Sequence, residues 1–295
     1  MWDKQINKPI GQLYAEINES YLYHEDNMKK LYFLFCIVSI IAGYSFSSIS
    51  AQSPYSLYLD KETTIFSSSL VLGIIDNELI KKKEPLSLHD LSGLSRKNIN
   101  SFDRGATYNW SPSSSDWSDV LLAASILSPL ILFTSEAVRD DIGTFSTMYL
   151  QNILTTYSVS HLPKGTITRY RPYVYNEDVP EQIKQKVDAT HSFFSAHTSV
   201  SFASSVFLSC AFSKYNPDSN LNPYIWGTTL ILATTVGYLR YASGEHFPTD
   251  IITGAVVGSA IGFLIPFLHK TVESNETLSP FKVSFNNLIS IGFSF

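Results

Sequence analysis

The chain has 295 residues and a formal net charge of -5, with only 16% charged residues but 14% aromatic residues. This length suits one domain of moderate size with an appendage, and it can bury a sizeable core. A nucleic-acid-binding protein normally carries a dense basic stripe, and the sequence has none. The long charge-free stretches indicate a membrane-associated or compact helical protein.

Residues 1–51 are predicted to be an N-terminal extension followed by a signal peptide or an anchor. A polar start leads to two lysines after Met28, an apolar run from Leu31 to Tyr44 and small residues up to Ala51. This order is typical of a secretory signal peptide cleaved near Ala51, with Met28 as the true start. A retained transmembrane anchor is the alternative. Both interpretations export the rest of the chain.

Residues 52–119 are predicted to be a mixed helical and loop region that packs on the core. Thr63 to Ile80 is expected as one helix and Leu88 to Leu94 as a short second helix. The following stretch up to Trp117 contains Pro112 and a run of serines, and we expect it to be a loop.

Residues 120–270 are predicted to form the core of the protein. Its apolar runs predict these helices: Val120–Ser135, Ile142–Ser160, Ser195–Phe212, Tyr224–Leu239 and Ile251–Leu268. In the last run, Gly254, Gly258 and Gly262 recur every four residues, a spacing that permits close contact with another helix. We therefore expect an all-α fold, a helical bundle of five to six core helices.

The predicted helices fit two placements, either across a membrane or buried in a soluble bundle. The last two runs carry no charge on any face, which favours membrane association. In the C-terminal tail, residues 271–295, apolar and polar residues alternate, and this pattern predicts one or two short β-strands.

Three short segments carry residues suited to binding a phosphate ester. A phosphoryl group in transfer spreads negative charge over its equatorial oxygens, and cations and backbone N–H groups stabilise that charge. A helix that begins at Ser195 would direct its hydroxyl and the N–H groups of Ala196 and His197 toward an anion. The residues that we assign to phosphate binding are Lys164, Arg171, Ser195, Ala196 and Arg240.

Two histidines and one aspartate in the same segments suit the chemistry of cleavage. Asp250 follows His246 by four residues, a spacing at which the carboxylate can accept from one imidazole nitrogen and leave the other as a nucleophile. Pro248 indicates a helix start, so the helix dipole would keep Asp250 ionised. His197 is then the general acid. We expect no metal ligands and no cofactor.

The order and spacing of these residues resemble the type 2 phosphatidic acid phosphatase family, which shares its core with bacterial class A acid phosphatases and vanadium haloperoxidases. The family pattern is Lys, six residues, Arg-Pro; then Pro-Ser-Gly-His; then Ser-Arg, five residues, His, three residues, Asp. The first element matches from Lys164 to Pro172, and the third matches at Arg240, His246 and Asp250. The departures are Phe194 for proline, Ala196 for glycine and Leu239 for serine. None of them removes a group that performs chemistry.

The resemblance extends over about Val120 to Lys270 and implies a metal-independent phosphatase. Such an enzyme hydrolyses a phosphomonoester or pyrophosphate through a phosphohistidine intermediate. The implied substrate is a lipid phosphate reached at the membrane, with the active site facing the periplasm of a bacterial cell envelope. Two alternatives stay open: a vanadate-dependent haloperoxidase with His246 as the vanadate ligand, and a non-catalytic phospholipid-binding envelope protein.

Overall fold

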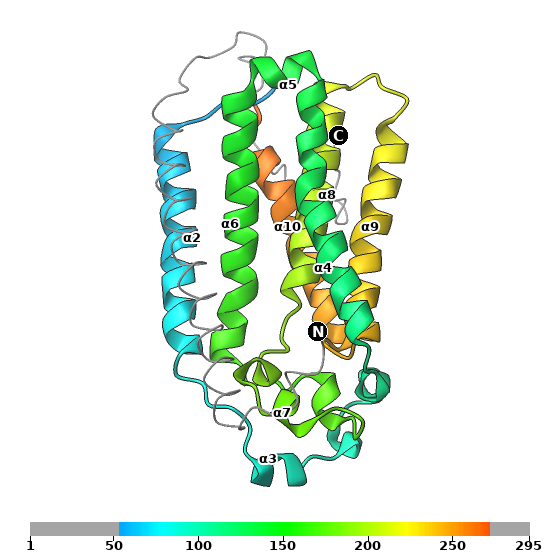
Figure 1. Cartoon of the computed structure of the whole chain (residues 1–295). Coiled ribbons are helices and arrows are strands. Elements are labelled where there is room, and N and C mark those ends of the chain that lie inside the picture. Colours follow the sequence, from blue (N-terminus) through cyan, green and yellow to red (C-terminus); the bar gives the residue numbers. More distant parts are fainter. Residues whose placement is uncertain (1–52, 272–295) are drawn as a thin grey trace, which may run out of the picture.

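The computed structural model describes residues 53–271, and these residues form an all-α bundle (Figure 1). Its long helices are α2 (Leu59–Ile80), α4 (Pro112–Leu127), α6 (Ile142–Thr166), α8 (Ala196–Tyr215), α9 (Asn222–Ala242) and α10 (Pro248–Leu268). The predicted helical bundle is therefore confirmed. The signal peptide or anchor and the C-terminal strands lie outside the described residues.

Short helices and 3-10 turns connect the long helices. They are α3 (Leu88–Ser92), η1 (Arg96–Asn98), η2 (Arg104–Tyr108), η3 (Ser128–Thr134), α5 (Glu136–Asp140), η4 (Pro172–Tyr175), α7 (Glu181–Lys184) and η5 (Val187–Thr190). Most of them gather with α3 and α7 at one end of the bundle, the lower end in Figure 1.

The serine run after Pro112 is helical, so the prediction of a loop there is wrong. Pro112 is the first residue of α4, and the side chain of Ser111 accepts a hydrogen bond from the Ser114 N–H at 3.3 Å. A proline at the first helical position and a serine cap both stabilise a helix start. Helix α4 therefore begins about two turns before the apolar run that starts at Val120, and its polar first turns lie at the lower end of the bundle (Figure 1).

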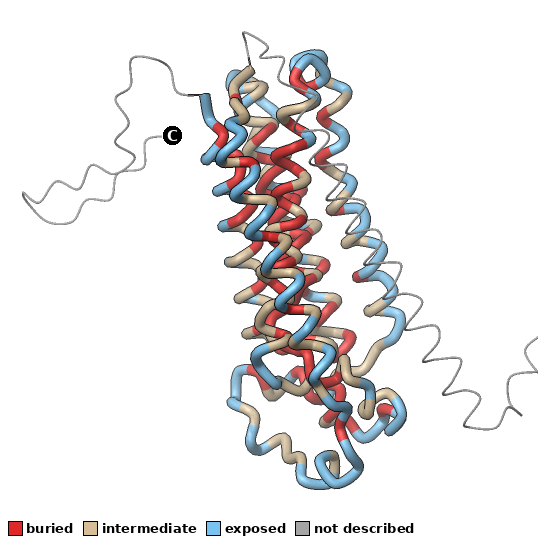
Figure 2. The backbone as a smooth tube through the Cα atoms, turned by 90° about the vertical axis from the view of Figure 1, so that its left-hand side faces the viewer, coloured by how far each residue is buried: buried red, intermediate tan, exposed pale blue. Residues whose placement is uncertain are grey.

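Helix α8 lies at the centre of the bundle and packs against α10, α9, α6 and α4. Helix α2 lies at the edge and packs along α6 (Figure 1). Figure 2 shows that buried residues follow the interior of the bundle over its whole length, while exposed residues cover the outside and the lower loops. The ends of the helices around α8 are therefore held at fixed positions relative to one another.

The glycines of α10 allow the closest helix contact in this arrangement. A Cβ on Gly258 would lie 2.0 Å from the carbonyl oxygen of Ser199, and one on Gly262 would lie 2.5 Å from that of Ala203. A Cβ on Gly254 would lie 2.6 Å from the carbonyl oxygen of Ser195. Only glycine fits at these distances, which confirms the predicted close contact and fixes the start of α10 against the start of α8.

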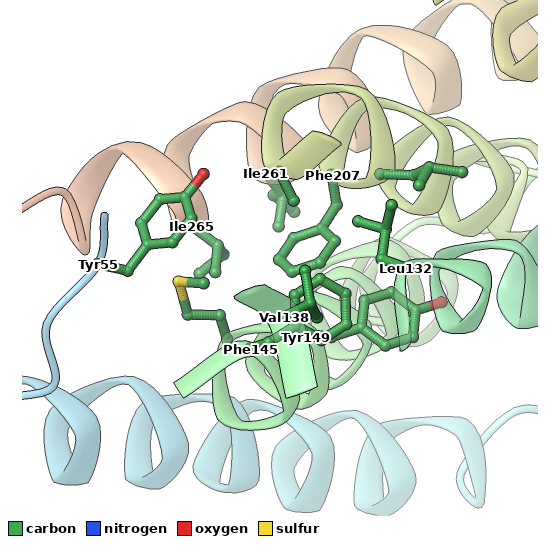
Figure 3. Close-up of a cluster of buried hydrophobic side chains, with 11 residues drawn as sticks. Tyr55, Leu132, Val138, Phe145, Tyr149, Phe207, Ile261 and Ile265 are labelled. Atoms are coloured by element: carbon green, nitrogen blue, oxygen red, sulfur yellow. The ribbon is translucent and has the colours of Figure 1, made fainter. Parts of the chain in front are cut away.

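An apolar cluster locks the upper half of the bundle, and its aromatic rings join α6 to α8 (Figure 3). The Phe145 ring lies edge-on to that of Phe207, with centroids 5.5 Å apart, and the Tyr149 ring lies 5.0 Å from the same partner. Tilted and edge-on pairs of this kind add to the stability gained from burial. This cluster holds α6 against α8 at the end of the bundle opposite α3 and α7.

Three segments of the described chain are long and apolar enough to cross a membrane: Leu59–Ile80, Pro112–Thr134 and Pro248–Leu268. Their outer faces expose large apolar side chains, including Val71 (53% exposed) and Val256 (64%). Water is a poor solvent for such surfaces, whereas lipid chains accommodate them. The bundle is therefore suited to association with a membrane.

Candidate active site

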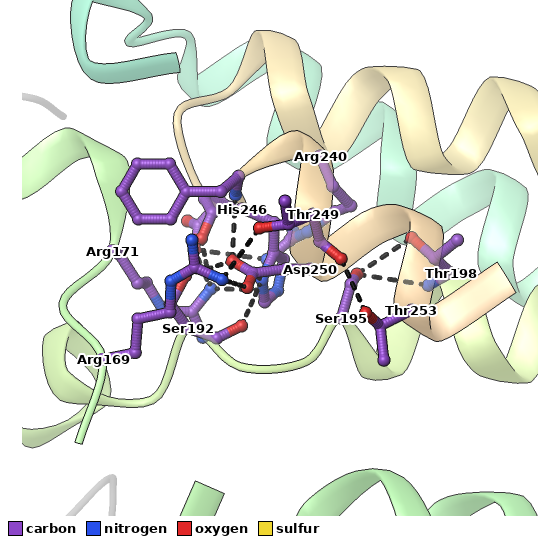
Figure 4. Close-up of polar contacts among 12 residues, drawn as sticks. Arg169, Arg171, Ser192, Ser195, Thr198, Arg240, His246, Thr249, Asp250 and Thr253 are labelled. Carbon is purple, nitrogen blue, oxygen red and sulfur yellow. Dashed lines mark hydrogen bonds and ion pairs between the residues drawn. The ribbon is translucent and has the colours of Figure 1, made fainter. Parts of the chain in front are cut away.

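The residues predicted to bind and cleave phosphate come together at the lower end of the bundle. Helices α6 and α9 end there, and α8 and α10 begin there. Close contacts join the side chains of Arg169, Arg171, Ser192, His246 and Asp250 in this region (Figure 4).

A tight turn after α9 carries His246 into the interior. Gly244 in this turn has φ 78°, and a Cβ there would lie 2.2 Å from the carbonyl oxygen of Asn109. Its own carbonyl oxygen accepts from the Tyr173 N–H at 2.9 Å. A left-handed glycine ends helices without steric cost. The turn thus packs against the segments around Asn109 and Tyr173. The His246 ring beside it is buried, at 1% exposed.

The imidazole of His246 is held through one nitrogen. Its Nδ1 lies 2.7 Å from the carbonyl oxygen of Ser192. A carbonyl oxygen can only accept, so Nδ1 carries the proton and Nε2 keeps its lone pair. Nη1 of Arg171 donates a long hydrogen bond to Nε2, at 3.4 Å.

The surroundings of His246 keep it neutral. Burial, followed by the nearby cations of Arg171, Arg240 and Lys164, lowers the pKa of His246 well below its usual range. The ring therefore stays neutral, with Nε2 unprotonated, over the pH range in which histidine usually titrates, as a nucleophile requires.

Asp250 supports His246 less directly than the sequence predicts. Its Oδ2 lies 3.7 Å from Nδ1 of His246, which is an ion-pair distance and too long for a hydrogen bond. The same oxygen accepts from the Ser192 hydroxyl at 2.6 Å and from the Phe247 N–H at 3.0 Å. Asp250 thus fixes Ser192, and the Ser192 carbonyl orients the imidazole.

Arg169 ties this arrangement to the loop before α4. Its guanidinium bonds to the carboxylate of Asp250, to Oδ2 of Asp103 at 2.7 Å and to the Thr249 hydroxyl at 3.0 Å. Asp103 is fully buried and also accepts from the Thr249 N–H at 3.1 Å. Burial alone would raise the pKa of Asp103, but hydrogen bonds from Asn100 and Thr249 and the charge of Arg169 bring it below its ordinary value.

Two buried arginines lie beside His246. Nη2 of Arg171 lies 2.7 Å from Asp188, and its Nη1 pairs with the carboxylate of Glu245. Nη2 of Arg240 lies 3.2 Å from the same Glu245 oxygen. The cations of Arg171 and Lys164 hold the pKa of Asp188 below its usual range. Acidic groups thus balance the charge of both arginines.

Lys164 completes the set of cations. It lies in the last turn of α6, which extends beyond the predicted end at Ser160, and it is 8% exposed. It interacts electrostatically with Arg171, Arg240 and Asp76, the last of these on α2. The three predicted phosphate-binding cations therefore lie in one cluster.

Ser195 caps α8, as its position in the sequence predicts. Its hydroxyl oxygen accepts from the N–H of Thr198 at 3.4 Å and from the hydroxyl of Thr198 at 2.9 Å. The oxygen serves the helix itself, so only its proton is left for an anion. The first N–H groups of a helix have no acceptor within it, which leaves those of Ala196 and His197 for an anion.

His197 lies in the first turn of α8 and contacts α4. Its Nε2 lies 2.7 Å from Oδ1 of Asp119, and Nη1 of Arg240 lies 3.8 Å from the same oxygen. Nη1 of Arg240 also donates to the hydroxyls of Ser115 and Ser118, at 3.2 and 3.1 Å. Burial, followed by the charge of Arg240, lowers the pKa of His197 to about 4, while the hydrogen bond and the charge of Asp119 act in the opposite direction.

Several residues of this site were not identified from the sequence: Ser192 as a hydrogen-bonding residue, Arg169, Asp188 and Glu245 inside or beside the motifs, and Asp103 and Asp119 in the region before the core. Arg169 and Glu245 lie within the motifs, and this position was a signal that they belong to the site. Glu245 is acidic, however, and an acidic residue is not expected in a site that binds an anion. Within residues 53–271, no group of three or more His, Cys, Asp or Glu residues could hold a metal ion.

The part of the chain that carries these residues matches a known family. Residues 145–273 match the model of the PAP2 superfamily. This stretch of the chain is similar to the PAP2 superfamily. The matched residues include every residue predicted to bind or cleave phosphate, and the match supports a phosphatase as the kind of enzyme.

One solved structure resembles the chain over most of its length. It is described as the crystal structure of the first transmembrane PAP2 type phosphatidylglycerolphosphate phosphatase from Bacillus subtilis. The two chains are 18% identical, the similarity covers 70% of this chain and 95% of that one, and the TM-score is 0.40. Comparison with curated proteins gives no match.

Proposed function

We propose that this protein is a metal-independent lipid phosphatase that hydrolyses a phosphomonoester or pyrophosphate through a phosphohistidine. The main support is the position of His246. Its Nε2 is unprotonated and lies 3.4 Å from Arg171, while Nδ1 is held by a backbone carbonyl. A nucleophile is thus placed beside the cations that suit a phosphate.

In the proposed first step, Nε2 of His246 attacks phosphorus in line and the bond to the leaving oxygen breaks. His197 gives its proton to that oxygen. Lys164, Arg171 and Arg240, together with the N–H groups at the start of α8, stabilise the charge on the equatorial oxygens. In the second step, His197 takes a proton from water, the water oxygen bonds to phosphorus, and the bond to His246 breaks to release phosphate.

The substrate is proposed to be a lipid phosphate. Three segments of the chain can cross a membrane, and the site lies where the helices end. A phosphate headgroup could enter there while its acyl chains stay in the bilayer. We also expect this end to face the periplasm. Labelling of a cysteine placed at the exposed position Glu177 by a membrane-impermeant maleimide in intact cells tests that orientation, and protection from the label would contradict it.

The test of the activity is phosphate release by the full chain in detergent with EDTA, using lipid phosphates and water-soluble esters. His246→Asn should lower turnover by at least about 1,000-fold, because the nucleophile is lost. An alkaline quench should trap labelled phosphohistidine in the wild type and none in the variant. Normal turnover by His246→Asn would reject the mechanism, and binding of phosphatidic acid without release of phosphate would favour a non-catalytic lipid-binding protein.

A further inference from the structure

Glu245 lies between the two arginines proposed to bind phosphate. One of its carboxylate oxygens, Oε2, pairs with Nη1 of Arg171 and lies 3.2 Å from Nη2 of Arg240. The same Nη1 of Arg171 lies 3.4 Å from Nε2 of His246. A single acidic oxygen thus bridges both guanidiniums next to the nucleophile, where an oxygen of a bound phosphate would be expected.

We propose that Glu245 determines specificity: its carboxylate competes with the substrate for Arg171 and Arg240, so that dianionic phosphate monoesters bind and monoanionic phosphodiesters do not. This inference rests on the proposed function, which assigns both arginines to the phosphate.

The charges around the arginines explain the selectivity. Asp188 stays on one side of Arg171, and Asp119 lies 3.8 Å from Arg240. A phosphodiester has one charge and two free oxygens, so it would only replace one carboxylate by a similar anion. Expelling Glu245 from a buried ion pair makes that exchange unfavourable. A phosphomonoester carries a charge of about -1.5 to -2 and three strong acceptor oxygens at neutral pH, so it can reach Lys164 as well as both arginines.

The location of the site makes such selectivity useful. Phosphodiester headgroups are abundant at a bilayer surface, and an open cluster of three cations would bind them. Glu245 neutralises the cluster until a more highly charged anion arrives. Its side chain is 17% exposed, so it contacts solvent and can leave the arginines by rotating toward water.

The test compares two small anions that the enzyme does not need to turn over. Titration calorimetry on the full chain in detergent, at about pH 8, measures the binding of inorganic phosphate, mainly a dianion, and of dimethyl phosphate, a monoanion. The wild type should bind phosphate at least about tenfold more tightly than dimethyl phosphate. Glu245→Gln should bind dimethyl phosphate about tenfold more tightly than the wild type does. Glu177→Gln makes the same change at a side chain that is 93% exposed, in the loop after η4, and should behave as the wild type.

Equal binding of both anions by the wild type would overturn the proposal, and this measurement needs no variant. Unchanged or weaker binding of dimethyl phosphate by folded Glu245→Gln would show instead that Glu245 only orients the arginines. If phosphate binds as expected but no ester is hydrolysed, the proposed function fails while the selectivity stands. If phosphate does not bind at all, both fail.

Discussion

Residues 53–144 and residues 145–271 supply the site with different kinds of side chain. The second part supplies the histidines and all three proposed phosphate-binding cations, and it lies within the match to the PAP2 superfamily. The first part lies before that match and, among the contacts described above, supplies only acceptors. These are Asp103 for Arg169, Asp119 for His197, and Ser115 and Ser118 for Arg240. The second part also contributes acceptors such as Asp188 and Glu245.

This difference follows from what each group must do. A residue that binds or attacks the phosphate must place a positive charge or an imidazole nitrogen at a defined position. Its residue type and its spacing along the chain are therefore restricted. A residue that holds an arginine or histidine needs only an oxygen within hydrogen-bond distance, and a loop or any neighbouring helix can provide it. If the two parts differ in this way, substitutions in residues 145–271 should lower turnover more than matched substitutions in residues 53–144.

The contact between His197 and Asp119 gives the largest expected contrast. His197→Asn should lower kcat by about 100- to 10,000-fold, because the proton donor is lost. Asp119→Asn should lower it by only about 10-fold, because the side chain of Asp119 is 61% exposed and water can replace the acceptor. Steady-state phosphate release measures both effects.

The double variant tests whether the two residues act together. His197→Asn combined with Asp119→Asn should be little worse than His197→Asn alone, since Asp119 is proposed to act through the histidine. Asp116→Asn makes the same change at an exposed position of α4 and serves as the control. Multiplicative losses in the double variant would show that Asp119 has a separate role.

Asp103 should affect stability more than chemistry. Asp103→Asn removes a fully buried charge that pairs with Arg169. The side-chain oxygen of the asparagine can still accept from the Thr249 N–H. We expect the free energy of unfolding to fall by about 1–3 kcal/mol and kcat to fall by less than in His197→Asn. Thermal unfolding in detergent measures the first effect, and Asp178→Asn, at the surface, is the control.

The pH dependence of the same variant sharpens this prediction. The pKa of Asp103 is lower in the folded chain than its ordinary value of about 3.9. Its stabilising effect is therefore complete above about pH 4 and is lost as pH falls through the folded pKa. The stability difference between wild type and Asp103→Asn should shrink below about pH 4. A difference that stays constant down to pH values well below that would mean that the charge of Asp103 does not carry the effect.

The sequence predicted most of the bundle because its signals are local. Apolar runs located the cores of α6, α8, α9 and α10, and the glycines of α10 predicted its close contact. The start of α4 was predicted as a loop because a serine run has weak helix propensity, yet Ser111 and Pro112 stabilise a helix start there. Weak propensity was outweighed by the cap.

The orientation of His246 shows what the spacing of two residues along the chain cannot predict. The spacing of four positions from His246 to Asp250 predicted a direct hydrogen bond, but the carboxylate bonds to Ser192, whose carbonyl holds the ring. Ser192 comes from the loop before α8, and only the packing of α8 against α10 brings it to the imidazole. A spacing along one segment does not reveal a partner that a different segment contributes.

The sequence by itself determined the helical class, the apolar character of the last long helix and the residue types suited to a phosphate, because these depend on local composition and short spacings. The tertiary structure alone decided which acceptors hold those residues and that Glu245 bridges Arg171 and Arg240. Such contacts depend on where separate helices end, and those positions are fixed by the packing of the whole bundle around α8.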